Sequence, residues 1–516
     1  MTPPPTIPPP TPGMDPSSDS IPVHPRGKTI PARHLPRLRP SLRGEAPTET
    51  LPMVGSLKGT PYRDPRVTRA VAEEQAAAEV MDLALRVGEM MLRCGAGARS
   101  VEAASMAVGI AGGLPDMDVD LTMQSLHMQC RTTSGKVITR LRVVRRPKQD
   151  FARLAAVHTL VEELVNGEVD VEQATARLRE ISRAHRTWAG WAVAVANGGV
   201  AAGVAMSLGA GWGGIVVALL TALLNDQVIR GLSTFSLPAF FTSAIGGALA
   251  TVIAFIAYVM GIEGWIPISP SDFAFVVAGG IVSLLPSRTI TSAMEDIISG
   301  FPVTGTARMF EVMLHTFGII VGVATGLGLS LQLADALSLA LVPPPITKLA
   351  WASGSPTVVM VGAAIVGASA AVVSQSRRRM LIPAALLGMT AVLVASTLTG
   401  ADFGRLTATG IAGVVLGFAA RIVALRLKAP AVTLAVPGSL GLMPGLAIFV
   451  GLYRLTQRSD EQAWAAVQAA GLAGVLTAFG VIFAIAIGST LGDLLAAPFD
   501  GAVRARRQRT EERKKR

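Results

Sequence analysis

The chain has 516 residues, of which 50% are hydrophobic and only 16% are charged, and its mean hydropathy is +0.49. Soluble domains carry about 25% charged residues, so this composition excludes an ordinary soluble protein. The net charge of +11 does not indicate nucleic-acid binding. The basic residues lie in the N-terminal third, in short loops and in the tail, beside apolar stretches, as in the cytoplasmic flanks of membrane proteins.

The first third of the chain precedes any apolar stretch long enough to span a membrane. Residues 1–72 are rich in Pro and Arg and cannot bury a core, so we expect a disordered arm. Residues 73–186 have the pattern of a small cytosolic α+β domain. Two helical stretches separated by CGAG come first, VDLTMQSLHMQC and KVITRLRVVRR then predict a hairpin, and two amphipathic helices follow.

Ten apolar stretches follow Arg186, against about 20 residues for each membrane crossing. Their approximate bounds are 188–208, 212–225, 237–260, 272–287, 308–330, 356–374, 380–398, 406–424, 430–452 and 463–491. With a cytosolic N-terminal domain, the densest basic clusters all fall in the inside loops and the tail, as the positive-inside rule requires. We therefore expect a polytopic α-helical membrane protein with both termini in the cytoplasm. Its parts would be two five-span halves, 187–332 and 356–495, an extracytoplasmic linker, 333–355, and a basic tail, 496–516.

The fourth and ninth stretches carry the same interruption. FVVAGGIVSLLPSRTI (275–290) and TLAVPGSLGLMPGLAI (433–448) both contain Gly-x-x-x-Leu-x-Pro. The ninth stretch comes five spans after the fourth, an odd offset, so related halves would be inserted with opposite topology, as in many secondary transporters. Broken helices free backbone groups that are tolerated only against protein or a water-filled cavity. The breaks therefore predict a substrate pathway; the alternative is that both are Pro kinks that fix helix packing.

Six motifs occur in order: VGEMMLRCGAGARSVEAA, the VRR at 144–146, RLAAVHTL, GGIVSLLP, SGFPVTGTARM and KAPAVTLAVPGSLGLMPGLAIF. Together they resemble the threonine/serine exporter family over residues 75–495 or so. The resemblance implies export of L-threonine and L-serine across the bacterial cytoplasmic membrane, driven by the proton-motive force. The implied partners are small amino acids, protons and the lipid bilayer, with no cofactor and no nucleic acid, and a homo-oligomer is compatible with it. The family's cytosolic domain has also been likened to hydrolases, so a membrane-anchored hydrolase is the alternative.

The sequence offers little for enzymatic chemistry. The nearest match to a phosphate-binding loop is Gly27-Lys28-Thr29, but Pro22 stands where its first glycine should be, so we expect secondary transport. Cys94, His127 and His158 are the only residues of the domain that suggest nucleophilic catalysis. No Gly-x-Ser-x-Gly elbow and no zinc-ligand spacing accompany them. We therefore expect no enzyme, no metal, and a Cys94 that packs in the turn between two helices.

Three ionisable residues begin the fifth span. Arg308, Glu311 and His315 are spaced by three and four residues, which places them on one helix face. A carboxylate near an arginine stays ionised, and a histidine exchanges protons near neutral pH. We expect Glu311 and His315 to form a proton relay that Arg308 tunes. The alternative is an ordinary Arg308–Glu311 ion pair at the interface, with His315 bonded to a neighbouring carbonyl.

The two breaks are suited to an amino acid zwitterion, because freed amides bind a carboxylate and freed carbonyls an ammonium group. Ser283 and Ser439 lie beside the breaks, where a hydroxyl can bind the substrate hydroxyl or, alternatively, its own helix backbone. Asp296 lies in SRTITSAMEDIISG, which is too polar to span and predicts an amphipathic cytoplasmic helix or a re-entrant segment. The expected pathway residues are Gly280, Ser283, Pro286, Asp296, Pro437, Gly438, Ser439, Pro444 and Gly445.

Overall fold

The computed structural model of the chain describes residues 65–122, 124–132, 135–144, 149–235, 237–336, 355–456 and 461–501. Residues 69–516 form one compact unit. The expected arm up to residue 64, residues 337–354 of the expected linker and the tail beyond residue 501 lie outside the described residues.

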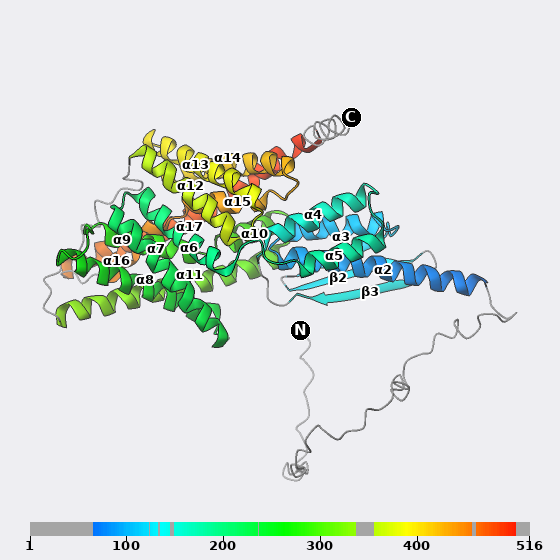
Figure 1. The fold of residues 1–516 in the computed structure, drawn as a ribbon, viewed down its shortest axis with the longest axis horizontal. Coiled ribbons are helices and arrows are strands. Elements are labelled where there is room, and N and C mark those ends of the chain that lie inside the picture. Colours follow the sequence, from blue (N-terminus) through cyan, green and yellow to red (C-terminus); the bar gives the residue numbers. More distant parts are fainter. Residues whose placement is uncertain are drawn as a thin grey trace, which may run out of the picture. The chain divides into compact units, whose positions relative to one another are not determined.

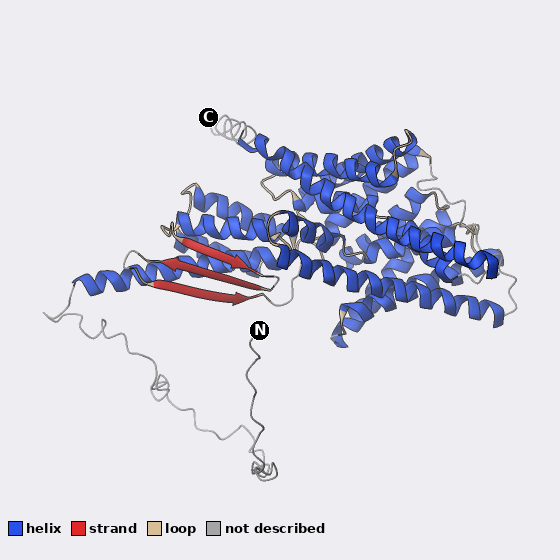
Figure 2. Ribbon diagram, turned by 180° about the vertical axis from the view of Figure 1, so that it is seen from behind, coloured by secondary structure: helices blue, strands red, loops and turns tan. Residues whose placement is uncertain are grey.

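The N-terminal domain consists of four helices and a three-stranded antiparallel sheet (Figures 1 and 2). In chain order the elements are α2 (Pro65–Arg93), α3 (Ala98–Ala111), β1 (Met117–Leu121), β2 (Ser125–Arg131), β3 (Val137–Val143), α4 (Phe151–Val165) and α5 (Val171–Arg183). Asp150 and Asp170 cap α4 and α5, since their side chains accept hydrogen bonds from backbone N–H groups of the first turns. These helices and the sheet together give the domain an α+β arrangement.

The sheet packs one face against the helices. Along β2, Leu126, Met128 and Cys130 are buried while the residues between them are exposed, which is the period of a strand with one covered face. The expected two-stranded hairpin is wrong in one respect, because VDLTMQSLHMQC contains two strands. Thr122 and Ser125 form a turn within this segment. The Thr122 N–H donates a hydrogen bond to the Ser125 carbonyl (2.9 Å), and the two hydroxyls are hydrogen-bonded to each other (2.6 Å).

Helices of the membrane part follow the domain. The first half comprises α6 (Gly190–Leu208), α7 (Trp212–Leu232), α8 (Ala239–Ile262), α9 (Asp272–Leu284), α10 (Ser287–Ile298) and α11 (Pro302–Ala336). The second half comprises α12 (Pro356–Val373), α13 (Leu381–Gly400), α14 (Arg405–Arg426), α15 (Val432–Ser439), α16 (Gly445–Thr456) and α17 (Glu461–Ala496). Short 3₁₀ turns lie at Ser233–Phe235, Arg378–Met380, Leu440–Leu442 and Ala497–Phe499.

Among the described residues, eight helices are long and apolar enough to cross a membrane, and two bent helix pairs bring the number to ten. The bent pairs are α9–α10 and α15–α16, at the positions where Pro286 and Pro444 predicted interruptions. The expected polytopic helical membrane fold is confirmed.

Small residues bring the membrane helices close together. On α11, Gly318, Gly322 and Gly326 lie against backbone atoms of α8, and on α14, Gly413 and Gly417 lie against backbone atoms of α17. Repeated small residues four apart allow such close backbone contact in lipid, where apolar burial gives helices little reason to associate. The third and fifth spans of each half therefore pack against each other in the same way.

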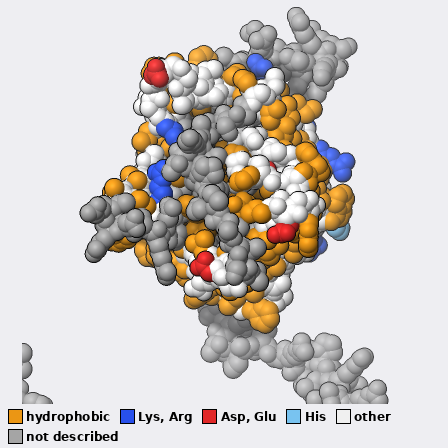
Figure 3. Space-filling view, turned by 90° about the vertical axis from the view of Figure 1, so that its left-hand side faces the viewer, with side chains coloured by type: hydrophobic (Ala, Val, Ile, Leu, Met, Phe, Trp, Pro, Cys, Tyr) orange, Lys and Arg blue, Asp and Glu red, His pale blue; other side chains and the backbone are white. Residues whose placement is uncertain are grey.

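The basic loops gather at the end of the helix bundle that carries the domain. Arg230, at the end of α7, donates to the Gly190 carbonyl at the start of α6 (3.1 Å). Arg379 donates to the Leu427 carbonyl (2.8 Å), and the domain residue Thr159 lies 3.4 Å from the Lys428 carbonyl. The face shown in Figure 3 is mostly hydrophobic or uncharged, with charged side chains scattered singly over the part that is described.

Candidate functional site

The first broken helix bends by 53° between α9 and α10. Pro286 follows the end of α9 and has no N–H to continue the helix. The Leu284 carbonyl, next to the break, accepts a hydrogen bond from His315 on α11. Ser283 donates to the Gly280 carbonyl of its own helix (2.7 Å). A carbonyl at the break is thus satisfied by a side chain of another helix.

The second broken helix bends by 43° between α15 and α16. Pro437 lies inside α15 and Pro444 directly precedes α16. Ser439 donates to the Val436 carbonyl (2.9 Å), again within its own helix. Gly438 packs against Leu416 of α14.

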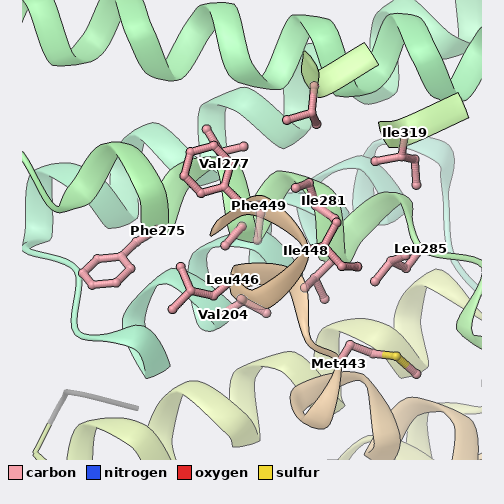
Figure 4. Close-up of a cluster of buried hydrophobic side chains, with 14 of the residues drawn as sticks. Val204, Phe275, Val277, Ile281, Leu285, Ile319, Met443, Leu446, Ile448 and Phe449 are labelled. Atoms are coloured by element: carbon pink, nitrogen blue, oxygen red, sulfur yellow. The ribbon is translucent and has the colours of Figure 1, made fainter. Parts of the chain in front are cut away.

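The two breaks pack against each other. A Cβ on Gly445 would lie 2.6 Å from the Ala278 carbonyl oxygen and would also collide with the Val282 side chain, both on α9. Around this contact the side chains are apolar and buried, including Leu285, Met443 and several neighbours from α9 and α16 (Figure 4). The breaks therefore meet in a dry, closed contact.

Asp296 and Arg308 form a buried ion pair just beyond the first break. Asp296 on α10 is 0% exposed, and its Oδ2 lies 2.5 Å from Arg308 Nη1 on α11. The other carboxylate oxygen accepts a hydrogen bond from the Ala98 N–H, at the start of α3 in the domain (2.6 Å). Thr304 on α11 donates to the Leu121 carbonyl of β1 (3.2 Å). The first half thus binds the domain through α10 and α11.

The three residues of the expected proton relay share α11 but lie in different environments. Arg308 is buried and pairs with Asp296, Glu311 is exposed, and His315 is half-buried and bonded to the Leu284 carbonyl. The sequence placed Arg308 beside Glu311 because of their spacing. Arg308 instead turns to α10, because the chain reverses after Ile298 and lays α10 along α11.

The second half binds the domain through the loop between α12 and α13. The N–H groups of Phe151 and Ala152, at the start of α4, donate to the carbonyls of Ser374 (3.0 Å) and Gln375 (3.1 Å). Gln375 adopts a φ of 56°, and its side-chain amide pairs with both backbone groups of Trp188. The Trp188 indole N–H donates to the Ser376 carbonyl (2.8 Å). The domain is therefore hydrogen-bonded to both halves.

A cavity of about 520 Å³ lies between the domain and the membrane helices. Helices α3 and α4 line it on the domain side, and α10, α14, α15 and α17 on the membrane side. Its charged residues include Glu295, Arg421, Asp493 and Asp500. Arg421 on α14 lies 2.7 Å from Asp493 and 2.6 Å from Asp500.

Sequence reasoning missed this cavity. The four charged residues named above lie on α10, α14 and α17 and just after α17, so no local motif joins them. The available signal was Arg421, which lies inside the apolar stretch 406–424, where an ionisable side chain is expensive unless it is paired or functional.

The domain shows no catalytic constellation among its described residues. Cys94 is 2% exposed, and burial, assisted by the Asp150 carboxylate, raises the pKa of its thiol to about 12. Such a thiol stays protonated and is a poor nucleophile at neutral pH. Across the described ranges, no three His, Cys, Asp or Glu side chains group closely enough to hold a metal ion.

Two family models match the chain. One is described as "Putative threonine/serine exporter" and matches residues 82–330; the other is described as "Threonine/Serine exporter, ThrE" and matches residues 359–495. A "Probable threonine/serine exporter" of Mycobacterium tuberculosis (strain ATCC 25618 / H37Rv) is 31% identical over 471 residues, which cover 89% of this chain and 83% of that protein. The "Threonine/serine exporter" of Corynebacterium glutamicum is 29% identical over 462 residues, covering 88% and 89%. No solved structure matches the chain.

Proposed function

Because the chain belongs to the threonine/serine exporter family, we propose that it exports L-threonine and L-serine across the bacterial cytoplasmic membrane. The names of both relatives support these substrates. The observation that carries the proposal is the pair of broken helices whose interruptions lie against each other, Gly445 on Ala278. Interrupted helices that meet inside the membrane are a recurring feature of substrate sites in secondary transporters.

The two halves are, in this proposal, an inverted repeat. Matched helix packing supports it: Gly247 of α8 lies against the Ile319 carbonyl of α11, and Gly413 of α14 against the Ile485 carbonyl of α17. The interval from Gly247 to Gly413 equals that from Ile319 to Ile485. α6 and α12, the first spans of the two halves, pack together, with Gly203 and Gly362 each against the other's carbonyl.

The residue offset from Gly247 to Gly413 also indicates which residues of the first half correspond to those of the charged cavity. It leads from Arg421 to Phe255 and from Asp493 to Leu327, and both of these apolar side chains are buried in the main core cluster. These two charged positions of the cavity thus correspond to buried apolar positions in the first half. This difference supports a transporter whose pathway is open toward the domain and closed on the opposite side.

We assign the domain and both termini to the cytoplasm. The basic loops lie at the end of the bundle that carries the domain, which supports this orientation by the positive-inside rule. The cavity would then be entered from the cytoplasm, the side from which an exporter takes its substrate.

We also propose that export is coupled to the proton-motive force. His315 contacts the Leu284 carbonyl at the first break, and a histidine exchanges protons near neutral pH. Glu311 precedes it by one helical turn and is exposed, so it can pass protons to and from His315. Arg308 contributes indirectly, by holding Asp296 and with it α10.

The substrate pathway of this proposal runs between the breaks. The hydroxyls of Ser283 and Ser439 donate to their own helices but retain lone pairs that can accept a hydrogen bond from the substrate hydroxyl. Since the contact between the breaks is closed, α9 and α16 must separate at Gly445 for an amino acid to pass.

The test is efflux of labelled L-threonine and L-serine from loaded cells that lack their own exporter, with and without this protein. We expect faster efflux of both, a collapse with an uncoupler, and no effect on unrelated amino acids. Glu311→Gln and His315→Ala should remove the uncoupler-sensitive part. No acceleration for either substrate, with the protein shown to be inserted, would reject the proposed function.

A further inference from the structure

The charged cavity has the size and chemistry for a small zwitterion. Its volume of about 520 Å³ exceeds that of an amino acid with a short side chain, and it is bounded by carboxylates on one side and by the start of a helix on the other. Small side chains of α3, among them Ser100, Ala103 and Ala104, form part of the wall on the domain side, together with side chains of α4.

Two carboxylates of the cavity are available to a cation. Within the described part of the chain, the Glu295 carboxylate makes no ion pair and no hydrogen bond. On Asp493, Oδ2 is paired with Arg421, while Oδ1 is buried without a hydrogen-bond partner among the described residues. Glu295 and Asp493 are close enough to interact electrostatically. Two neighbouring carboxylates in a poorly solvated site are stabilised when a cation lies between them.

The opposite requirement, a site for an anion, is met by the first turn of α3. An α-helix leaves its first N–H groups without internal acceptors and presents a partial positive charge there. The Ala98 N–H is used by Asp296, and those of Arg99 and Ser100 follow it. The exposed Arg99 side chain is not part of the cavity's lining, but its guanidinium is within electrostatic range of Glu295 and Asp493 and adds positive charge beside this turn.

Gly97 keeps these two groups close together. A Cβ at this position would lie 2.9–3.0 Å from the carboxylate atoms of Glu295, so only glycine lets the start of α3 approach Glu295 this closely. The negative end of the cavity and the start of α3 therefore lie next to each other.

We propose that this cavity binds the head group of the exported amino acid, with Glu295 and Asp493 receiving its ammonium group and the first turn of α3 receiving its carboxylate, which the nearby Arg99 charge stabilises electrostatically. The cytosolic domain then forms one wall of the cytoplasmic substrate site. This assignment rests on the proposed function and gives the domain a direct part in it.

The test is equilibrium binding of labelled L-threonine to the purified full-length protein in lipid nanodiscs. Two competitors test the two charged groups of L-threonine separately: 3-hydroxybutyrate lacks the ammonium group and threoninol lacks the carboxylate. We expect Glu295→Gln to weaken L-threonine and threoninol at least tenfold and to leave 3-hydroxybutyrate unchanged. Arg99→Gln should weaken L-threonine and 3-hydroxybutyrate but not threoninol.

The matched control is Glu263→Gln, because Glu263 is an exposed carboxylate at the opposite end of the bundle. Asp493→Asn also removes a partner of Arg421. Glu295→Gln is therefore the decisive variant, because the Glu295 side chain forms no ion pair with another described residue. If the wild type exports and binds L-threonine while Glu295→Gln and Arg99→Gln bind all three ligands as the wild type does, the site is wrong and the proposed function stands. If the wild-type protein neither exports nor binds any amino acid, both are wrong.

Discussion

Gly326 provides the sharpest test of how the membrane helices pack. A Cβ at this position of α11 would lie 2.8 Å from the Ala248 carbonyl oxygen and 3.0 Å from both the Ala248 Cα and the Thr251 Cβ. Ordinary Cβ contacts begin at 3.4 Å, so α8 would have to move away by about 0.6 Å. All three neighbours are backbone or Cβ atoms, so no change of rotamer relieves the collision. Overpacking of this kind costs about 1–3 kcal/mol.

Gly328, on the same helix, is the matched control because a Cβ there meets no atom within 4 Å. Gly328→Ala should leave stability unchanged or raise it by up to about 1 kcal/mol, since alanine favours the helix more than glycine does. Reversible unfolding in mixed micelles of increasing SDS content would compare the two variants. We expect Gly326→Ala to be less stable than Gly328→Ala by about 1–3 kcal/mol. Equal stabilities would refute the close contact between α8 and α11.

Three further predictions concern the domain and its contacts. Asp296→Asn should lower the free energy of unfolding by about 3–5 kcal/mol, because it leaves Arg308 buried without a counter-charge. Adding Arg308→Met should restore part of that loss. A double variant that is no more stable than Asp296→Asn would contradict this expectation. Trp188→Phe removes the hydrogen bond to the Ser376 carbonyl and should lower the free energy of unfolding by about 0.5–1.5 kcal/mol, seen as a lower midpoint of thermal unfolding. An unchanged midpoint would show that this bond contributes nothing to stability. Burial raises the pKa of the Cys94 thiol to about 12 in the folded protein, above the value of about 8.5 in the unfolded chain. The stability that the protonated thiol contributes is therefore complete below pH 8.5 and decreases as the pH rises toward 12. At pH 8.5 iodoacetamide should accordingly modify Cys94 only after unfolding, and rapid labelling of the native protein would contradict its burial.

Much of the fold could be predicted because hydropathy depends on local sequence. Ten apolar stretches, two of them interrupted at Pro286 and Pro444, correspond to the spans and the bent pairs. The sheet was harder, because the turn between β1 and β2 contains neither glycine nor an Asn-Gly pair. It is formed by hydroxyl and backbone bonds between Thr122 and Ser125, which the strand-like alternation of the sequence conceals.

The site was less predictable, because its contacts join residues far apart in the chain. Arg308 was paired with Glu311 from helical spacing, but α10 folds back along α11 and supplies Asp296 instead. The Arg421–Asp493 pair connects α14 to α17, and no local pattern brings these residues together. Spacing predicts neighbours on one helix, whereas the pairing of buried charges depends on which helices meet.

The hydrogen bonds that join the domain to both halves have a consequence for conformational equilibria. The Ala98 N–H binds α10 in the first half, while the N–H groups of Phe151 and Ala152 bind the loop after α12 in the second. Any movement of one half relative to the other must break one of these sets, at about 0.5–1.5 kcal/mol for each bond. The two bonds of the second set together amount to about 1–3 kcal/mol, a substantial part of the roughly 5.5 kcal/mol that moves a two-state population from 1:99 to 99:1. The domain's contacts thus contribute to the relative stability of any two arrangements of the halves, and a ligand held between the domain and the helices would add its binding energy to the same balance.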